Sequence, residues 1–378
     1  MTPAPRSSSA SPGTPDLYDP TDHATAEAVV WSGQHAVVVG SAGRSDATPS
    51  TANPVFVDGA RYHGWIRAID DRGAAGWTRR LEGGREVHVR AVASLGDDLV
   101  IAGEHRDGDA RVYTGWVARI APDGSERWRL DRLGAAGVTG LQAVAVRGDG
   151  TVVAGGTRRG KAWLVAIDGQ GKLGWEHDVA GLDEVTSLMA AGGGVVAAGI
   201  IGRTTTSAGT SRVIAVDATG VTRWSTEAPE RGRGELYAIA PLADGGIAVG
   251  QAPGADGRDG AWIVRFEANG AIRSSQVVPA TGVDAARAVA ATADGGFVVA
   301  GGSLEALRGR RGRVWRFDGA GKQLWQQAYG DREALVRGVA ATPDGGAVVV
   351  GATQAIGAML QPWIFGVDRQ GAQRWTVQ

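Results

Sequence analysis

Seven polar or aromatic side chains recur at one position of a repeated segment, and their types suit the binding of an anion. Each stands just before a short run of Ala and Val, and successive runs lie about fifty residues apart. Three of the seven are arginines, whose planar guanidinium groups bind carboxylates and phosphates through paired hydrogen bonds. The set consists of Glu27, Arg90, Gln142, Ser187, Tyr237, Arg287 and Arg337.

Three functions are consistent with this set. A binding or scaffold protein would engage a small anionic or polyhydroxylated ligand, or a protein partner, through these side chains. An enzyme, either a hydrolase or a lyase, would hold an anionic substrate with the arginines and use Tyr237, Glu27 or a nearby histidine as acid or base. A hydrated channel would instead pair the arginines with carboxylates. The carboxylates expected nearby are Glu86, Glu235, Asp284 and Glu333.

Histidines are the other candidates for acid–base chemistry. Of the six in the chain, His63, His88 and His105 fall near the same end of the repeat and could form an acid–base or metal site. Their spacing matches no metal-binding motif, and neither G-x-S-x-G nor H-E-x-x-H occurs. We therefore predict neither a metal ion nor a cofactor.

The elements that position these side chains are β-strands. Units such as RAVAATADGGFVVAG (287–301) followed by RVWRFDGAGKQLW (313–325) recur seven times. Each unit has four short segments rich in Val, Ile and Trp, separated by DGG and D-x-x-G turns, which is typical of β-hairpins. No segment has the 3.6-residue period of an amphipathic helix. The sequence predicts a seven-bladed β-propeller with four antiparallel strands per blade.

The domain boundaries follow from the repeat. A Pro- and Ser-rich leader over residues 1–24 is expected to be disordered. It is either the start of a cytosolic chain or a linker whose signal peptide was replaced by Met, and we favour the second, extracytoplasmic location. We also hypothesise that residues 17–23 help the first blade to pack on the last. The propeller is expected over 25–378, with blades at 25–80, 88–131, 140–179, 185–227, 235–278, 285–328 and 335–378.

Thirteen tryptophans could suggest a sugar-binding platform, but most recur once per unit. Such recurrence indicates packing between adjacent sheets. The recurrent glycines of the DGG turns are likewise expected to supply positive φ angles rather than phosphate-binding loops. One set of tryptophans opens the fourth strand of the units, at Trp77, Trp128, Trp175, Trp224, Trp325 and Trp375. The other lies in the third strand, at Trp65, Trp116, Trp163, Trp262 and Trp363.

The repeat resembles the bacterial seven-bladed β-propeller repeat over nearly all of residues 26–378. Its A-x-D-x-x-G-x-x-x-W portion, as in residues 68–77, 166–175 and 215–224, is also similar to the tryptophan-docking motif of pyrroloquinoline-quinone dehydrogenases. The resemblance implies the fold and leaves the function open. The dehydrogenases usually have eight blades and a disulfide between adjacent cysteines, whereas this chain has seven repeats and no cysteine. A bound quinone is therefore not expected.

Composition excludes several other functions. The chain of 378 residues carries 39 basic and 40 acidic residues, a net charge of −1, which argues against nucleic-acid binding. The absence of cysteine excludes disulfides, thiolate metal sites and a cysteine nucleophile. No apolar run approaches the roughly 20 residues that a membrane-spanning helix requires. We expect a monomer.

The predicted functional face carries the longer connections, between the second and third strands and between units. Those connections include residues 41–64, 104–115, 200–211, 251–261 and 302–312. The ring of seven side chains should lie where this face meets the central channel. A run of arginines in the last of these loops is a further anion-binding candidate that we interpret as a solvated loop: Arg308, Arg310, Arg311 and Arg313.

Overall fold

The computed structural model describes residue 17 and residues 21–44, 61–107, 112–134, 139–204, 209–229, 234–279, 283–305, 309–330, 333–354 and 359–377. These residues form 28 β-strands. Among them there is no helix of sufficient length and apolar character to cross a membrane. The predicted leader lies almost entirely outside the described residues, as does much of the longest predicted loop, at 45–60.

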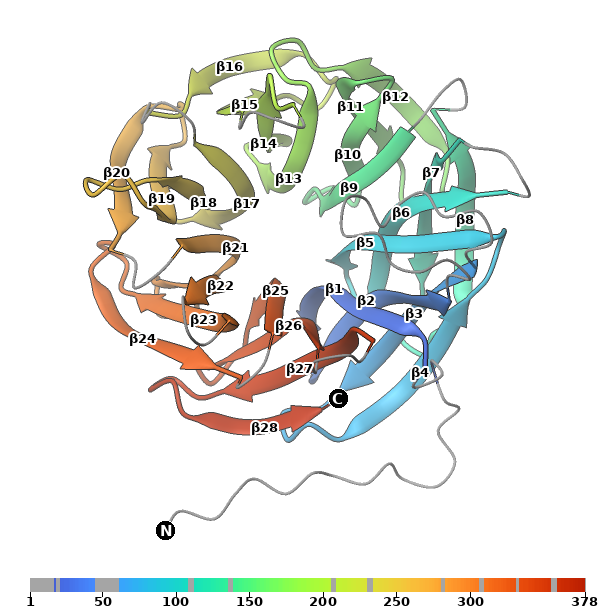
Figure 1. Ribbon diagram of the computed structural model, residues 1–378. Coiled ribbons are helices and arrows are strands. Elements are labelled where there is room, and N and C mark those ends of the chain that lie inside the picture. Colours follow the sequence, from blue (N-terminus) through green and yellow to red (C-terminus); the bar gives the residue numbers. More distant parts are fainter. Residues whose placement is uncertain are drawn as a thin grey trace.

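The strands follow one another in groups of four that are arranged around a central axis (Figure 1). The innermost strands are β1 (His23–Ser32), β5 (Glu86–Leu95), β9 (Thr139–Val146), β13 (Glu184–Ala191), β17 (Glu235–Leu242), β21 (Val283–Ala291) and β25 (Glu333–Ala341). The second strands are β2 (His35–Arg44), β6 (Asp98–Arg106), β10 (Val152–Arg158), β14 (Gly194–Ile201), β18 (Gly245–Pro253), β22 (Phe297–Glu305) and β26 (Ala347–Gln354).

The third strands are β3 (Arg61–Ile69), β7 (Thr114–Ile120), β11 (Lys161–Ile167), β15 (Thr210–Val216), β19 (Asp259–Glu267), β23 (Gly309–Phe317) and β27 (Gln361–Val367). The outermost strands are β4 (Ala75–Leu81), β8 (Glu126–Leu133), β12 (Leu173–Asp178), β16 (Thr222–Glu227), β20 (Ile272–Val278), β24 (Gln323–Tyr329) and β28 (Gln373–Val377).

Within each group the strands pair in antiparallel order, so the expected all-β organisation into units of four strands is confirmed. Five groups are separate four-stranded sheets. The first two groups join into one eight-stranded sheet through a single parallel pair, Tyr62 with Glu86. No strand pair joins β1–β4 to β25–β28 in the described part of the chain.

The core lies between adjacent sheets. The expected packing role of the third-strand tryptophans is observed, because all five are buried, with exposed fractions of 5% or less. One apolar cluster, for example, combines Val100 and Val117 of the second group with Leu141 and Trp163 of the third. Small residues allow this contact between sheets: a Cβ added at Gly115 would lie only 3.1 Å from Leu141 of the next group.

The outermost-strand tryptophans connect neighbouring groups. The indole Nε1 of Trp128 donates to the carbonyl of Gly169 in the next group at 3.0 Å, and that of Trp175 donates to Ala218 at 2.8 Å. The same bond connects the last group to the first, where Trp375 donates to the carbonyl of Asp71 at 2.8 Å. The last group therefore contacts the first through side-chain docking, and no strand is shared between them in the described part of the chain.

Residues near the amino terminus also take part in closure. Leu17 is buried in a cluster with Val348 and Val350 of β26, and its carbonyl lies 2.7 Å from Nε2 of His63. The backbone N–H of Ala24 donates to the carbonyl of Leu360 at 2.9 Å. These contacts support the hypothesis that residues 17–23 help the first group to pack on the last.

We expect Gly171→Ala to lower the free energy of unfolding by about 1–2 kcal/mol, because Gly171 has a φ of +87° and an added Cβ would lie 2.9 Å from Trp128. Gly169 provides a control in the same turn. It has no positive φ, and its added Cβ would meet nothing closer than 3.8 Å. Equilibrium denaturation should separate the two variants; equal losses would contradict the docking role of this turn.

Candidate functional site

A β-bulge in each inner strand positions the side chain that faces the channel. The pairing register of every inner strand shifts at one residue, and such bulges redirect the extra side chain. The redirected residues are Glu27, Arg90, Gln142, Thr186, Tyr237, Arg287 and Arg337. Six of the seven predicted positions therefore coincide with a bulge.

The fourth unit requires a correction, because the bulge falls at Thr186 and not at the predicted Ser187. Its first hairpin closes through a two-residue turn at Gly192 and Gly193, and the fifth unit likewise closes with two residues between Leu242 and Gly245. The bulge at Thr186 stands five residues before the end of its strand, as Tyr237 does in the fifth unit, so Ser187 lies one residue beyond the equivalent position. The hydroxyl of Ser187 instead accepts the backbone N–H of Ile239 at 3.1 Å.

One cavity of about 240 Å³ on the axis is lined by all seven predicted side chains and by Thr186. The adjoining lining consists of small or aliphatic residues of the inner strands, such as Ala91, Ala143 and Val289. The structure therefore brings the predicted ring together in one place, as the repeat implied.

Glu27 lies between two arginines of this ring, Arg90 and Arg337. Arg90 donates two hydrogen bonds to Oε1 of Glu104, at 2.7 and 3.2 Å, and lies 4.0 Å from Glu27. Glu27 also lies 3.9 Å from Nε of Arg337. Burial alone would raise the pKa of Glu27, but Arg337 and Arg90 outweigh burial, so the pKa is lowered and the carboxylate stays ionised.

Tyr237 and Arg287 form a second contact within the ring. The Arg287 guanidinium lies over the Tyr237 ring, 4.0 Å from its centroid, and the Tyr237 hydroxyl donates to Glu235 at 2.9 Å. Burial, together with Glu235, raises the pKa of Tyr237 to about 12. Tyr237 is therefore a hydrogen-bond donor at neutral pH and is poorly suited to act as a base.

A second cavity of about 320 Å³ opens beside the channel and shares Arg287 and Arg337 with it. It lies between the β21–β24 and β25–β28 sheets, at the end of the strands where β22 finishes and β23 begins, and Arg310 also lines it. None of its lining residues in the described part of the chain is acidic. Buried Ser303 lines it too, and its hydroxyl has no hydrogen-bond partner within the described structure. We call this cavity the arginine pocket.

Sequence reasoning missed the arginine pocket, although Arg310 belongs to the arginine run already noted. That run does not act as a unit. Arg311 donates to the carbonyl of Gly330 at 2.9 Å, Arg313 is buried 3.9 Å from Asp284, and Arg308 lies outside the described residues. Only Arg310 reaches the pocket.

The carboxylates predicted to neutralise the ring arginines have other partners. Glu86 binds Arg106, Glu235 lies 3.4 Å from Arg203, and Glu333 accepts the backbone N–H of Arg310 at 3.0 Å. Asp284 faces Arg313. Among the described residues, no carboxylate pairs with the Arg287 side chain.

The three candidate histidines are not brought together. His63 bonds to Leu17, His105 is buried near Thr114, Asp107 and Asp131, and His88 lies 3.7 Å from Glu86. Burial lowers the pKa of His63 and of His105. Within the described ranges, no group of three or more His, Asp or Glu side chains could hold a metal ion.

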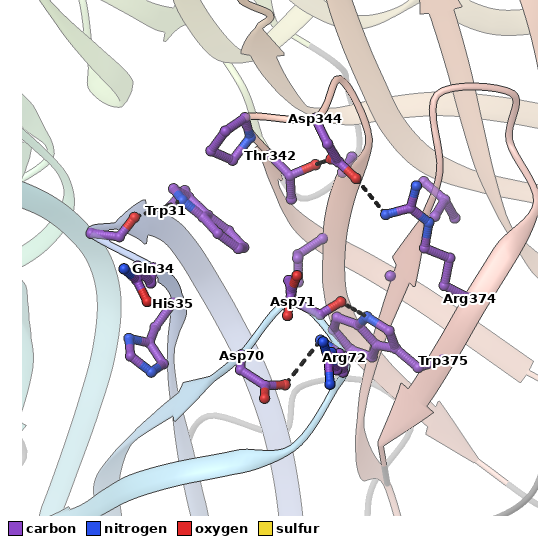
Figure 2. Close-up of a pocket in the computed structure, with 16 residues that line it drawn as sticks. Trp31, Gln34, His35, Asp70, Asp71, Arg72, Thr342, Asp344, Arg374 and Trp375 are labelled. Carbon is purple, nitrogen blue, oxygen red and sulfur yellow. Dashed lines mark hydrogen bonds and ion pairs between the residues drawn. The ribbon is translucent and has the colours of Figure 1, made fainter.

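A third cavity, of about 530 Å³, lies between the first and last groups (Figure 2). Turn residues from β1–β2, β3–β4 and β25–β26 line it, so it opens at the opposite strand ends from the arginine pocket. Trp31 and Trp375 line it from the two groups, with Asp71, Asp344 and Arg374 between or beside them. We call it the seam cavity; the repeat pattern had marked these turns as structural only.

No protein-family model and no curated protein sequence matches the chain. Solved structures match it in fold. The β-propeller domain of the Trilobed protease from Pyrococcus furiosus has a TM-score of 0.52 at 10% identity, over 93% of this chain and 98% of that one. The β-propeller domain of Cps50 (Swd1) from Myceliophteria thermophila has a TM-score of 0.55 at 13% identity, over 87% and 93%.

Sqt1 from Chaetomium thermophilum has a TM-score of 0.53 at 12% identity, over 94% of this chain and 84% of that one. At such low identity these likenesses concern the fold alone. The chain is therefore an all-β protein that is similar in fold to β-propellers.

Proposed function

We propose that this protein is a binding propeller that takes up a small anionic ligand in the arginine pocket and the adjoining mouth of the central channel. The observation that carries this proposal is the convergence of Arg287, Arg310 and Arg337 on a cavity whose described lining residues include no acidic side chain. Its volume of about 320 Å³ falls in the range of roughly 300–1,000 Å³ usual for small-molecule sites.

The arginines of the pocket are available to a ligand. Arg337 has 49% of its side chain exposed and touches Glu27 only at 3.9 Å, whereas Arg90 is fully engaged by Glu104. Arg287 rests on an aromatic ring, which orients the guanidinium without neutralising its charge. Ser303 supplies an additional hydroxyl donor. An anion with two or more oxygens, such as a carboxylate or a phosphate, fits this set of donors.

The alternative, an enzyme with its active site at the channel mouth, has less support. A general acid or base works best when its pKa lies near the working pH. The pKa of Glu27 is shifted downward and that of Tyr237 upward, so both move away from neutrality. We therefore favour binding without turnover.

We also propose that the propeller has seven blades, spanning about residues 25–378. The eight-stranded sheet is joined by one residue pair alone, so it is best counted as two blades. Each of its halves carries its own bulge, at Glu27 and at Arg90. Each half therefore contributes one side chain to the channel, as every other four-stranded sheet does.

Isothermal titration with inorganic phosphate and with citrate, at low salt, tests the binding proposal. We expect one of them to bind, and Arg337→Ala or Arg310→Ala to weaken binding about 10–100-fold, since a hydrogen bond to a charged group contributes roughly 1.5–3 kcal/mol. Arg223→Ala is the control, because Arg223 is exposed and pairs with Asp217 at the opposite strand ends. The proposal fails if neither anion binds, or if both pocket variants bind as the wild type does.

Glu27→Gln should act in the opposite direction. It removes the negative charge 3.9 Å from Arg337, so the same anion should bind several-fold more tightly. An unchanged or weaker affinity would show that Glu27 does not compete with the ligand for Arg337.

A further inference from the structure

At the seam cavity the last group of strands differs from the group before it. In the group before it, Arg316 of β23 lies opposite Trp325 and binds both carboxylate oxygens of Asp294 at 2.7 Å. Arg316 is 2% exposed, so its side chain fills the space beside the indole. Arg119 occupies the same place opposite Trp128 and binds Asp98 at 2.6 Å.

In the last group, Gly366 stands opposite Trp375, where the sixth and second groups have Arg316 and Arg119 and the fourth group has Ala215. The turn carboxylate is retained as Asp344, but it pairs with Arg374 of the outermost strand and with Thr342. A Cβ added at Gly366 would overlap the indole of Trp375, so the indole lies against β27 at this glycine. Gly366 and Asp344 both line the cavity.

The charged side chains at the seam between the last and first groups also differ from those at the preceding seam. Trp325 docks on the carbonyl of Arg369, and that arginine reaches Asp294 at 3.3 Å. Trp375 docks in the same way on Asp71, so a carboxylate replaces the arginine at this position. The preceding seam is thus closed by two arginines on one aspartate, whereas this seam holds Asp71, Asp344 and Arg374.

The wall of the cavity that the first group forms carries a larger side chain than the same place in the last group. Trp31 is the last-but-one residue of β1 and pairs with Ala36, as Ala341 pairs with Ala347 in the last group. A large indole therefore stands where the last group has a methyl group. Figure 2 shows Trp31 on one side of the cavity and Trp375 with Arg374 on the other. Gln34 and His35 lie beside Trp31.

We propose that the seam cavity is a second binding site, and that its ligand is a neutral saccharide. A pyranose ring has an apolar face that packs on an indole and hydroxyls that both donate and accept hydrogen bonds. The wall offers both partners: Asp71 and Asp344 accept, whereas Gln34 and Arg374 donate. The charged groups are of mixed sign, which favours an uncharged ligand over an anion or a cation. This site is independent of the arginine pocket.

Saturation-transfer NMR with maltotriose, cellotriose and chitotriose tests the proposal. We expect at least one to bind with a dissociation constant of about 0.1–1 mM. Trp31→Ala should weaken that binding at least about tenfold through loss of the indole face, and Asp71→Ala should weaken it several-fold. Both variants introduce a residue that another group carries at the same place, Ala341 and Ala218, so both should fold.

The controls separate the two sites. Arg337→Ala should leave saccharide binding unchanged, and Trp31→Ala should leave phosphate or citrate binding unchanged. The saccharide proposal is overturned if none of the three sugars shows transfer, or if Trp31→Ala binds as the wild type does. Binding of choline without binding of any sugar would equally overturn it, because it would identify the two indoles as a site for a cation.

Discussion

Glu86→Gln will lower the free energy of unfolding by about 3–5 kcal/mol, the usual cost of leaving one partner of a buried ion pair uncompensated. Glu86 and Arg106 are bonded to each other and have side-chain exposures of only 3% and 5%. The Tyr113 hydroxyl donates to the same carboxylate. The pair lies where the first two groups of strands join, since Glu86 is the residue that pairs with Tyr62.

Acid titration provides a second readout. Burial would raise the pKa of Glu86, but the hydrogen bonds from His88, Tyr113 and Arg106 outweigh it, so the pKa is lowered. The stabilisation is therefore present above the unfolded-state pKa of about 4.3 and is lost as the pH falls through the lower folded-state value. This acid-dependent part of the stability should disappear in Glu86→Gln.

Glu82→Gln is the matched control, because Glu82 pairs with Arg80 on the surface and should change stability by less than about 0.5 kcal/mol. Denaturant titration at neutral pH compares the two variants. Equal stability of Glu86→Gln and the wild type would show that the Arg106 charge is solvated and that the pair does not join the two groups.

Trp375→Ala should open the ring. The variant loses the hydrogen bond to Asp71 and the packing of the indole over Gly73, which has a φ of +84°. A fully buried Trp→Ala change costs about 3–5 kcal/mol, and Trp375 is half-buried, so we expect a loss of about 2–3 kcal/mol. Amide hydrogen exchange should become faster in β25–β28 and in β1–β4, because no strand pairing joins these groups among the residues that the structure describes.

Trp175→Ala provides the comparison at an internal seam, where the same bond is made to Ala218 at 2.8 Å. The chain itself connects the groups on the two sides of that seam, so faster exchange should stay local. If Trp375→Ala leaves exchange in β1–β4 and β25–β28 unchanged, closure does not depend on the indole and must rest on Leu17 and the Ala24–Leu360 bond.

The sequence by itself determined the units of four strands, because the alternation of Val and Ala with D-x-x-G turns is a local property of each segment. It also indicated six of the seven bulge positions, since equivalent positions of a repeat occupy equivalent places around an axis. The packing role of Trp163 and its counterparts followed in the same way from recurrence. In the fourth unit the bulge falls at Thr186, next to the predicted Ser187, and both residues line the channel cavity.

Tertiary structure alone decided the two pockets and the closure of the ring. Arg287, Arg310 and Arg337 come from two sheets and line one cavity. Their positions in the sequence do not show how far apart the three side chains lie. Trp375 meets Asp71 across 304 positions of the chain, at the one seam that no covalent connection bridges. The seam cavity combines Gly366, Asp71 and Trp31, which differ from their counterparts Arg316, Arg369 and Ala341 in the last two groups. Each departure is unremarkable by itself, and only the packing of the last sheet against the first turns the three into one cavity.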